Sequence, residues 1–144
     1  MFRGFILLIA FSLPAFAQPL QLGSLRIDHA WSRPTAAGMP MGVAYLAITN
    51  TGKDADALIG ASTPAAARVE MHQTTIAAGV ARMRPLAEVA LAPGATVKIE
   101  PGGIHLMLVE LKAPLVAGTT VPLQLTFRRA GRITVQLAVS AAGL

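Results

Sequence analysis

After an apolar N-terminal stretch, hydrophobic and polar residues alternate in short segments separated by turn residues. Residues 25–31 show the two-residue period of a half-buried strand, which places Leu25, Ile27, His29 and Trp31 on one face. No long stretch has helical spacing, and we find no low-complexity tract and no internal repeat. The pattern therefore predicts an all-β fold.

The segments with strand character are bounded by Gly, Pro, Asn and Asp residues. They cover residues 25–31, 42–50, 58–62, 68–76, 80–86, 89–91, 96–100, 104–111, 121–128 and 132–140. With the shortest counted as marginal, they amount to about eight or nine strands with a turn every eight to twelve residues or so. This spacing favours an antiparallel β-sandwich or Greek-key barrel that forms a single domain.

The first 17 residues have the pattern of a secretory signal peptide. Arg3 supplies positive charge, residues 5–13 are an almost unbroken apolar run, and Ala15 and Ala17 are the small residues that a signal peptidase reads. The run is shorter than the roughly 20 residues that span a bilayer, so an uncleaved anchor is the weaker alternative. We expect a signal peptide over residues 1–17, a mature domain over residues 18–144, and export to the periplasm without stable membrane insertion.

Composition narrows the functional classes. The chain has 144 residues, 53% of them hydrophobic and 13% charged, which is enough apolar surface for one ordered core. The formal net charge is only +5, the basic residues are scattered and aromatics are few, so we do not expect nucleic-acid binding. The chain contains no cysteine, so it forms no disulfide and any metal site must do without thiolate.

Four residues of the middle segment form a spaced set of metal donors. His72, Met83, His105 and Met107 follow the pattern His-x10-Met-x21-His-x-Met. Strand alternation makes His105 and Met107 project side by side, while Met71 points away from His72 into the core.

Residues 68–76 and 80–86 flank Ala77-Ala78-Gly79 and read as a hairpin, which lets His72 and Met83 approach each other across it. We therefore expect all four donors to converge at one edge of the sandwich. Imidazole and thioether are neutral, soft or borderline ligands, and such a cluster with no carboxylate suits Cu(I) far better than Mg²⁺, Ca²⁺ or Mn²⁺. The pattern predicts a Cu(I) site.

The same pattern resembles the signature of the periplasmic PCu(A)C copper chaperones, and the resemblance extends over most of the mature chain. Besides the four donors, the segments that are similar to this family are residues 28–34 (DHAWSRP), 42–46 (GVAYL), 48–52 (ITNTG), 83–85 (MRP) and 101–108 (PGGIHLML).

The resemblance implies a cupredoxin-like β-sandwich that binds Cu(I) through His72, Met83, His105 and Met107. It also implies delivery of copper to the CuA centre of a haem-copper oxidase, either to the oxidase subunit itself or beside a Sco-type protein. The motif specifies the metal and not the recipient.

Two other functions stay open: a periplasmic copper-scavenging or resistance protein with the same site, and a metal-independent secreted β-sandwich in which the four side chains merely pack. An enzyme is not expected, because the chain has no His-Glu-x-x-His and no serine nucleophile elbow. A blue-copper electron carrier needs a cysteine ligand and is excluded.

Several other residues have a simple structural interpretation. Met39 and Met41 are interpreted as packing or loop residues, with an auxiliary copper contact as the alternative. His29 is expected to be a structural histidine with its hydrogen bonds satisfied. Arg82 and Arg84 should point away from Met83, either as part of a solvated strand face or as a basic rim that steers an acidic partner.

Overall fold

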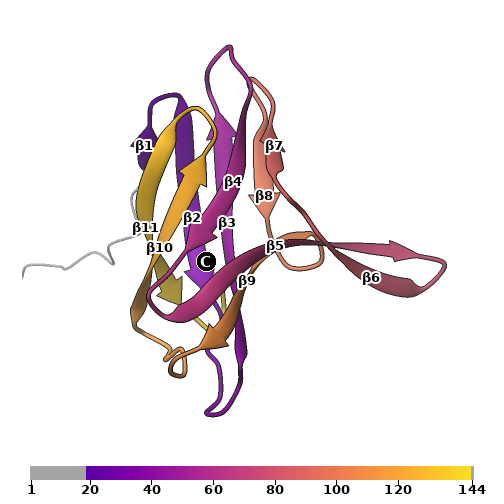
Figure 1. Ribbon diagram of the computed structural model, residues 1–144, viewed down its shortest axis with the longest axis vertical. Coiled ribbons are helices and arrows are strands. Elements are labelled where there is room, and N and C mark those ends of the chain that lie inside the picture. The colour runs from indigo at the N-terminus through magenta and orange to yellow at the C-terminus, as the bar shows by residue number, and fades with distance from the viewer. Residues whose placement is uncertain (1–18, 144) are drawn as a thin grey trace, which may run out of the picture.

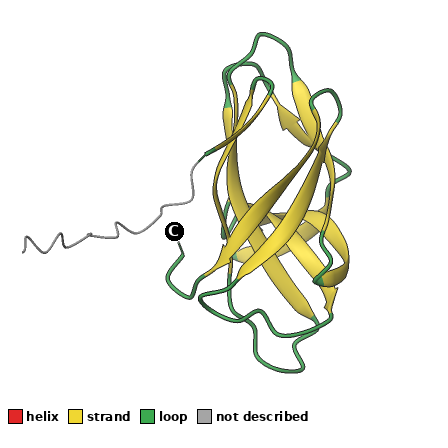
Figure 2. Cartoon of the chain, turned by 90° about the vertical axis from the view of Figure 1, so that its left-hand side faces the viewer, coloured by secondary structure: helices red, strands yellow, loops and turns green. Residues whose placement is uncertain are grey.

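The computed structural model describes residues 19–143, so the expected signal peptide over residues 1–17 lies outside them, as do Gln18 and Leu144. All regular structure in the described range is β (Figure 2), and no helix suited to crossing a membrane occurs there. The strands are β1 (Leu20–Leu22), β2 (Leu25–Ser32), β3 (Met41–Asn50), β4 (Asp56–Ser62), β5 (Ala66–Ala77), β6 (Val80–Pro85), β7 (Val89–Leu91), β8 (Thr96–Ile99), β9 (Ile104–Leu111), β10 (Thr120–Phe127) and β11 (Gly131–Val139). Of these, only the three-residue β1 has no counterpart among the segments predicted from the sequence.

The strands form one mixed sheet that folds over on itself to make a sandwich (Figures 1 and 2). Its order is β6-β5-β9-β8-β3-β2-β11-β10-β4-β7, with β1 added beside β2 and a further pairing between β9 and β3. The predicted all-β sandwich is confirmed. Pairing is antiparallel except for two short parallel contacts, β11 with β2 and β8 with β9, which strand periodicity alone does not reveal.

The core lies between the two halves of the folded sheet. Large apolar side chains from both halves are fully buried there, among them Ile48 on β3, Leu108 on β9 and Leu125 on β10. Removing each such side chain from water contributes about 1.5–3 kcal/mol to folding. The strands that carry the candidate donors are therefore held by the same core that holds the fold together.

The β5–β6 hairpin projects from the body of the sandwich, as Figure 1 shows. We call residues 73–85 the arm. Ala77 pairs with Val80, so the connection is a two-residue turn and not the three-residue turn that we predicted. Ala78 and Gly79 have φ angles of 51° and 77°, the left-handed values that a tight hairpin turn requires. All of β6 is exposed, and the buried core contains no residue of the arm.

The face assignment predicted for β2 is wrong beyond Ile27. A bulge interrupts the pairing of β2 with β3 between Asp28 and Trp31, and His29 adopts a left-handed φ of 53°. The extra residue shifts the alternation, so that Ala30 points into the core and His29 is exposed to solvent. His29 therefore lies at the surface, with its Nε2 3.6 Å from Asp28 Oδ1.

Asp56, the first residue of β4, anchors the turn between β10 and β11. Its Oδ1 accepts hydrogen bonds from the backbone N–H groups of Ala57 and Arg129, and its Oδ2 accepts one from Ala130. Partial burial raises the pKa of Asp56. The three hydrogen bonds and the charge of Arg129 together lower it by more, so the pKa lies below its ordinary value of 3.8.

Because the pKa is lowered in the folded state, ionised Asp56 stabilises the fold above pH 3.8, and this contribution is lost as the pH falls through the folded-state value. We expect Asp56→Asn to lower the free energy of unfolding by about 1 kcal/mol at neutral pH. The difference from the parent should narrow below about pH 4. Urea unfolding at several pH values measures this. Asp54→Asn is the control, and equal effects of the two substitutions would contradict the role of Asp56.

Candidate metal centre

Strand β9 supplies His105 and Met107 on one face and two core residues on the other. Leu106 and Leu108 are fully buried in the core, whereas His105 and Met107 lie on the outer face of the sheet. The strand runs between β5 and β3, so both neighbours shelter this outer face, and His105 is only 8% exposed. The alternation predicted for β9 is confirmed.

The turn before β9 fixes the orientation of the His105 ring. Gly102 adopts a φ of 84° in this turn, and the carbonyl oxygen of Gly103 lies 3.1 Å from His105 Nδ1 and 3.0 Å from the Thr74 backbone nitrogen. A carbonyl oxygen only accepts hydrogen bonds, so Nδ1 carries the proton. In the neutral ring, Nε2 therefore presents a free lone pair.

That lone pair faces a thioether. His105 Nε2 lies 3.2 Å from Met83 Sδ, which reaches it from β6 on the far side of β5. In the neutral state neither atom carries a hydrogen, so the contact is not a hydrogen bond. A tetrahedral metal ion with bonds of the length typical for zinc, about 2.0 Å to nitrogen and 2.3 Å to sulfur, holds its two donor atoms about 3.5 Å apart. The spacing therefore suits a borderline or soft cation held between them.

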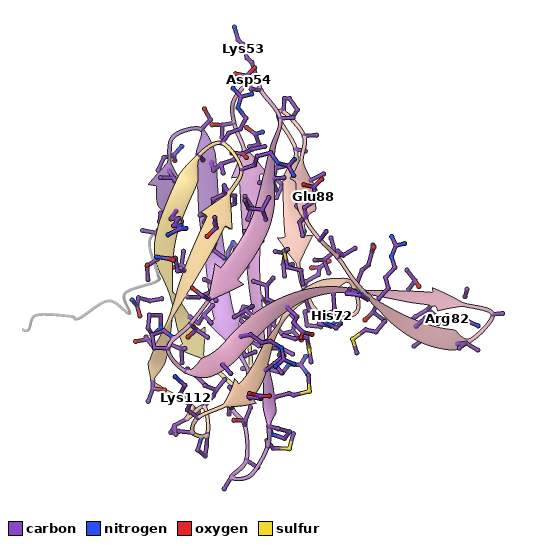
Figure 3. The ribbon with its side chains drawn as sticks, viewed as in Figure 1. Lys53, Asp54, His72, Arg82, Glu88 and Lys112 are labelled. Atoms are coloured by element: carbon purple, nitrogen blue, oxygen red, sulfur yellow. The ribbon has the colours of Figure 1, made fainter. Side chains whose placement is uncertain are left out.

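His72 stands directly opposite His105 across β5 and β9. The two ring centroids are 5.9 Å apart with an interplanar angle of 34°. Figure 3 shows His72 where the arm joins the body, and Arg82 far out along the arm. The strand pairing thus brings His72, Met83 and His105 together, as the sequence predicted.

Met107 occupies the next outward position along β9. It pairs with Glu70 on β5 and with Val43 on β3, and it is partly buried between them. It shares the outer face with His105, because residues two apart in a strand point to the same side. The fourth donor is therefore next to His105 along β9, on the same face.

A carboxylate that the sequence analysis did not single out, Glu70, lies beside His72. Its Oε2 accepts a hydrogen bond from His72 Nε2 at 2.9 Å, and its Oε1 accepts one from Arg68 Nε at 2.8 Å. The Arg68 hydrogen bond is the main cause that keeps the pKa of Glu70 below its ordinary value, with His72 the second. With Nε2 donating to Glu70, the free lone pair of neutral His72 lies on Nδ1.

The two-residue periodicity of β5 could have identified Glu70 from the sequence. Arg68, Glu70 and His72 alternate with core-facing residues on β5, so all three point to the outer face together. Arg68 also reaches Glu110 at 3.3 Å, which completes a short ion-pair chain along the edge of the site.

The remaining candidates fall outside this cluster. Met71 is buried in the core, as predicted. Arg84 contacts Gln73 across the hairpin, and alternation places Arg82 and Arg84 on the arm face opposite Met83. Between residues 19 and 143, no three His, Cys, Asp or Glu side chains are arranged to hold a metal ion.

Solved structures with a similar fold are copper-related domains. The copper-bound PCuAC domain from PmoF2 superimposes with a TM-score of 0.75 at 28% identity, over 86% of this chain and 98% of that one. The Cu(I) form of DR1885 from Deinococcus radiodurans gives a TM-score of 0.65 at 28% identity, over 88% and 83% of the two chains. The cupredoxin-like sandwich implied by the sequence resemblance is therefore confirmed.

Sequence comparison gives the family. A protein from Leifsonia xyli subsp. xyli (strain CTCB07), named Putative lipoprotein Lxx21020, is 36% identical over 121 residues, which cover 82% of this chain and 72% of the relative. The family described as "Putative lipoprotein LpqE-like" matches residues 25–139, nearly the whole of the described sandwich. The chain belongs to this LpqE-like family.

Proposed function

We propose that the protein is a Cu(I)-binding chaperone of the cell envelope that holds the ion at His72, Met83, His105 and Met107 and passes it on by ligand exchange. The 3.2 Å contact between His105 Nε2 and Met83 Sδ carries this proposal, because it joins two donors that lack a hydrogen in their neutral state. The similarity to a copper-bound PCuAC domain and to a Cu(I) protein supports it.

The donor set selects for a soft monovalent ion. Two imidazoles and two thioethers carry no charge, so they offer little to the hard cations that prefer oxygen ligands. Copper held by them keeps its single positive charge, and ionised Glu70 beside His72 partly compensates this charge. Copper is the cargo of this site and not a catalytic cofactor.

The donors differ in accessibility in a way that suits ligand exchange. His105 is 8% exposed in the sheet, whereas Met83 is 57% exposed on the arm. An incoming thiolate from a recipient reaches the ion most easily at Met83, where it displaces a neutral thioether. The buried imidazole retains the ion until a second recipient ligand arrives, so the ion is never released to water.

The recipient follows from the family resemblance alone. We propose the CuA centre of a haem-copper oxidase or a Sco-type protein, with scavenging or resistance as the alternative. Oxidase activity of a deletion strain at limiting copper separates these two functions.

We place the protein in the periplasm, exported by the signal peptide over residues 1–17. The relatives named as lipoproteins support an envelope location. None of the 144 residues of this chain is a cysteine, so none can hold a sulfur-linked lipid.

Met83→Leu tests the site without disturbing the core, because Met83 is exposed and leucine preserves its bulk. We expect the Cu(I) affinity to fall at least about tenfold, which corresponds to 1.4 kcal/mol, while thermal stability stays unchanged. The measurement is an anaerobic competition titration against a Cu(I) chelator. Ile76→Leu is the matched control, because Ile76 is 71% exposed on the same arm and carries no donor atom.

His105→Ala/Met107→Ala removes the two donors of β9 and should abolish tight binding of one Cu(I) equivalent. Circular dichroism checks that the variant still folds. A folded parent that does not compete for Cu(I) would overturn the copper proposal. Full Cu(I) binding by this double variant would instead show that His105 and Met107 are not the ligands.

Binding should weaken on acidification, because each imidazole must lose a proton to bind the ion whereas thioethers do not titrate. We expect the Cu(I) affinity to fall as the pH drops through the range in which imidazoles ordinarily titrate. The same competition titration at a series of pH values measures this. An affinity that stays constant down to about pH 4 would show that the histidines are not ligands.

A further inference from the structure

Two exposed methionines lie outside the four-residue set. Met39 is 53% exposed and Met41 is 38% exposed, so neither is buried in the core. An exposed methionine contributes little to packing, yet its polarisable sulfur remains available as a ligand. Other large apolar residues of comparable exposure, among them Leu20, Ile59 and Val116, carry no donor atom.

The register places Met41 beside the candidate centre. Met41 pairs with Val109, and Val43 pairs with Met107, in the antiparallel ladder of β3 and β9. Directly opposite residues point to the same side, so Met41 shares the outer face with Met107 and is its diagonal neighbour. Long side chains reach each other across such a diagonal.

Met39 lies just ahead of β3, and only Pro40 separates it from Met41. A residue that precedes proline is restricted to extended conformations, and Met41 already belongs to β3. A backbone hydrogen bond from the Leu111 N–H to the Pro40 carbonyl, 2.9 Å long, fixes this segment against the end of β9.

Exposure falls stepwise from this segment into the sheet. Met39 is 53% exposed, Met41 38%, Met107 is partly buried, and His105 is 8% exposed. The exposure of the soft donors thus decreases from Met39 to His105, and the β3 residue that pairs with Met107 is the uncharged Val43.

We propose that Met39 and Met41 form a second, outer Cu(I) site next to the four-donor centre, with Met107 on its inner side. The inference rests on the proposed function, since it assigns the same cargo to additional residues. Thioethers are neutral, so Cu(I) binds here by displacing solvent or buffer ligands, with no proton released and no change of oxidation state. The outer site lacks imidazole and is therefore weaker than the centre, and it fills after it.

Methionine methyl groups labelled with ¹³C report each site separately. The chain has five methionines other than Met1, and buried Met71 serves as an internal control. On anaerobic addition of Cu(I), we expect the Met83 and Met107 methyl signals to shift during the first equivalent. The Met39 and Met41 signals should shift during the second equivalent, while the Met71 signal stays in place throughout.

A double variant shows whether the sulfur atoms are needed. Met39→Leu/Met41→Leu should lose the second Cu(I) equivalent and keep the first with unchanged affinity, as measured by chelator competition. Ile59→Leu/Val116→Leu alters exposed apolar residues elsewhere and should retain both equivalents.

Unmoved Met39 and Met41 signals, with Met83 and Met107 shifting, would overturn the outer site and leave the centre intact. Binding of a second Cu(I) equivalent by Met39→Leu/Met41→Leu would also overturn the outer site. Unmoved signals at Met83 and Met107 would instead overturn the proposed function itself. The two failures are therefore distinguishable.

Discussion

The position of β9 inside the folded sheet is the constraint on which the candidate site depends. Its two neighbours, β5 and β3, hold it on both sides, and its alternating residues divide between the core and the outer face. Burial of Leu106 and Leu108 therefore fixes the direction in which His105 and Met107 point. A shift of one residue in the register would exchange donors and core residues, so the energy that stabilises the sandwich also sets the site.

The two imidazole rings are oriented by different hydrogen-bond partners. A carbonyl oxygen faces His105 Nδ1, and a carboxylate faces His72 Nε2, so the two rings present different nitrogens. Glu70 is itself held by Arg68, which keeps the carboxylate ionised. A change at Arg68 would therefore reach His72 through Glu70 without any direct contact with the donors.

Much of this arrangement could be predicted from the sequence, because it follows from period-two alternation. The predicted limits of β9 agree with the structure, and the hairpin that carries His72 and Met83 is present. Glu70 could have been found by the same alternation, which places it two residues from His72. The bulge at His29 could not, because it depends on the pairing with β3 and on a left-handed φ at a residue other than glycine. The short parallel contact between β11 and β2 likewise depends on how the sheet folds over.

The arm contributes one candidate donor and no core residue. The local stability of the arm is therefore distinct from the global stability of the sandwich. Opening of the hairpin is a local unfolding event, whose free energy is independent of the cooperative unfolding of the sandwich. If Met83 holds the ion as proposed, the lifetime of its bond to the ion depends on how often the arm opens. Substitutions in residues 73–85 can lengthen or shorten that lifetime during evolution without lowering the melting temperature of the domain.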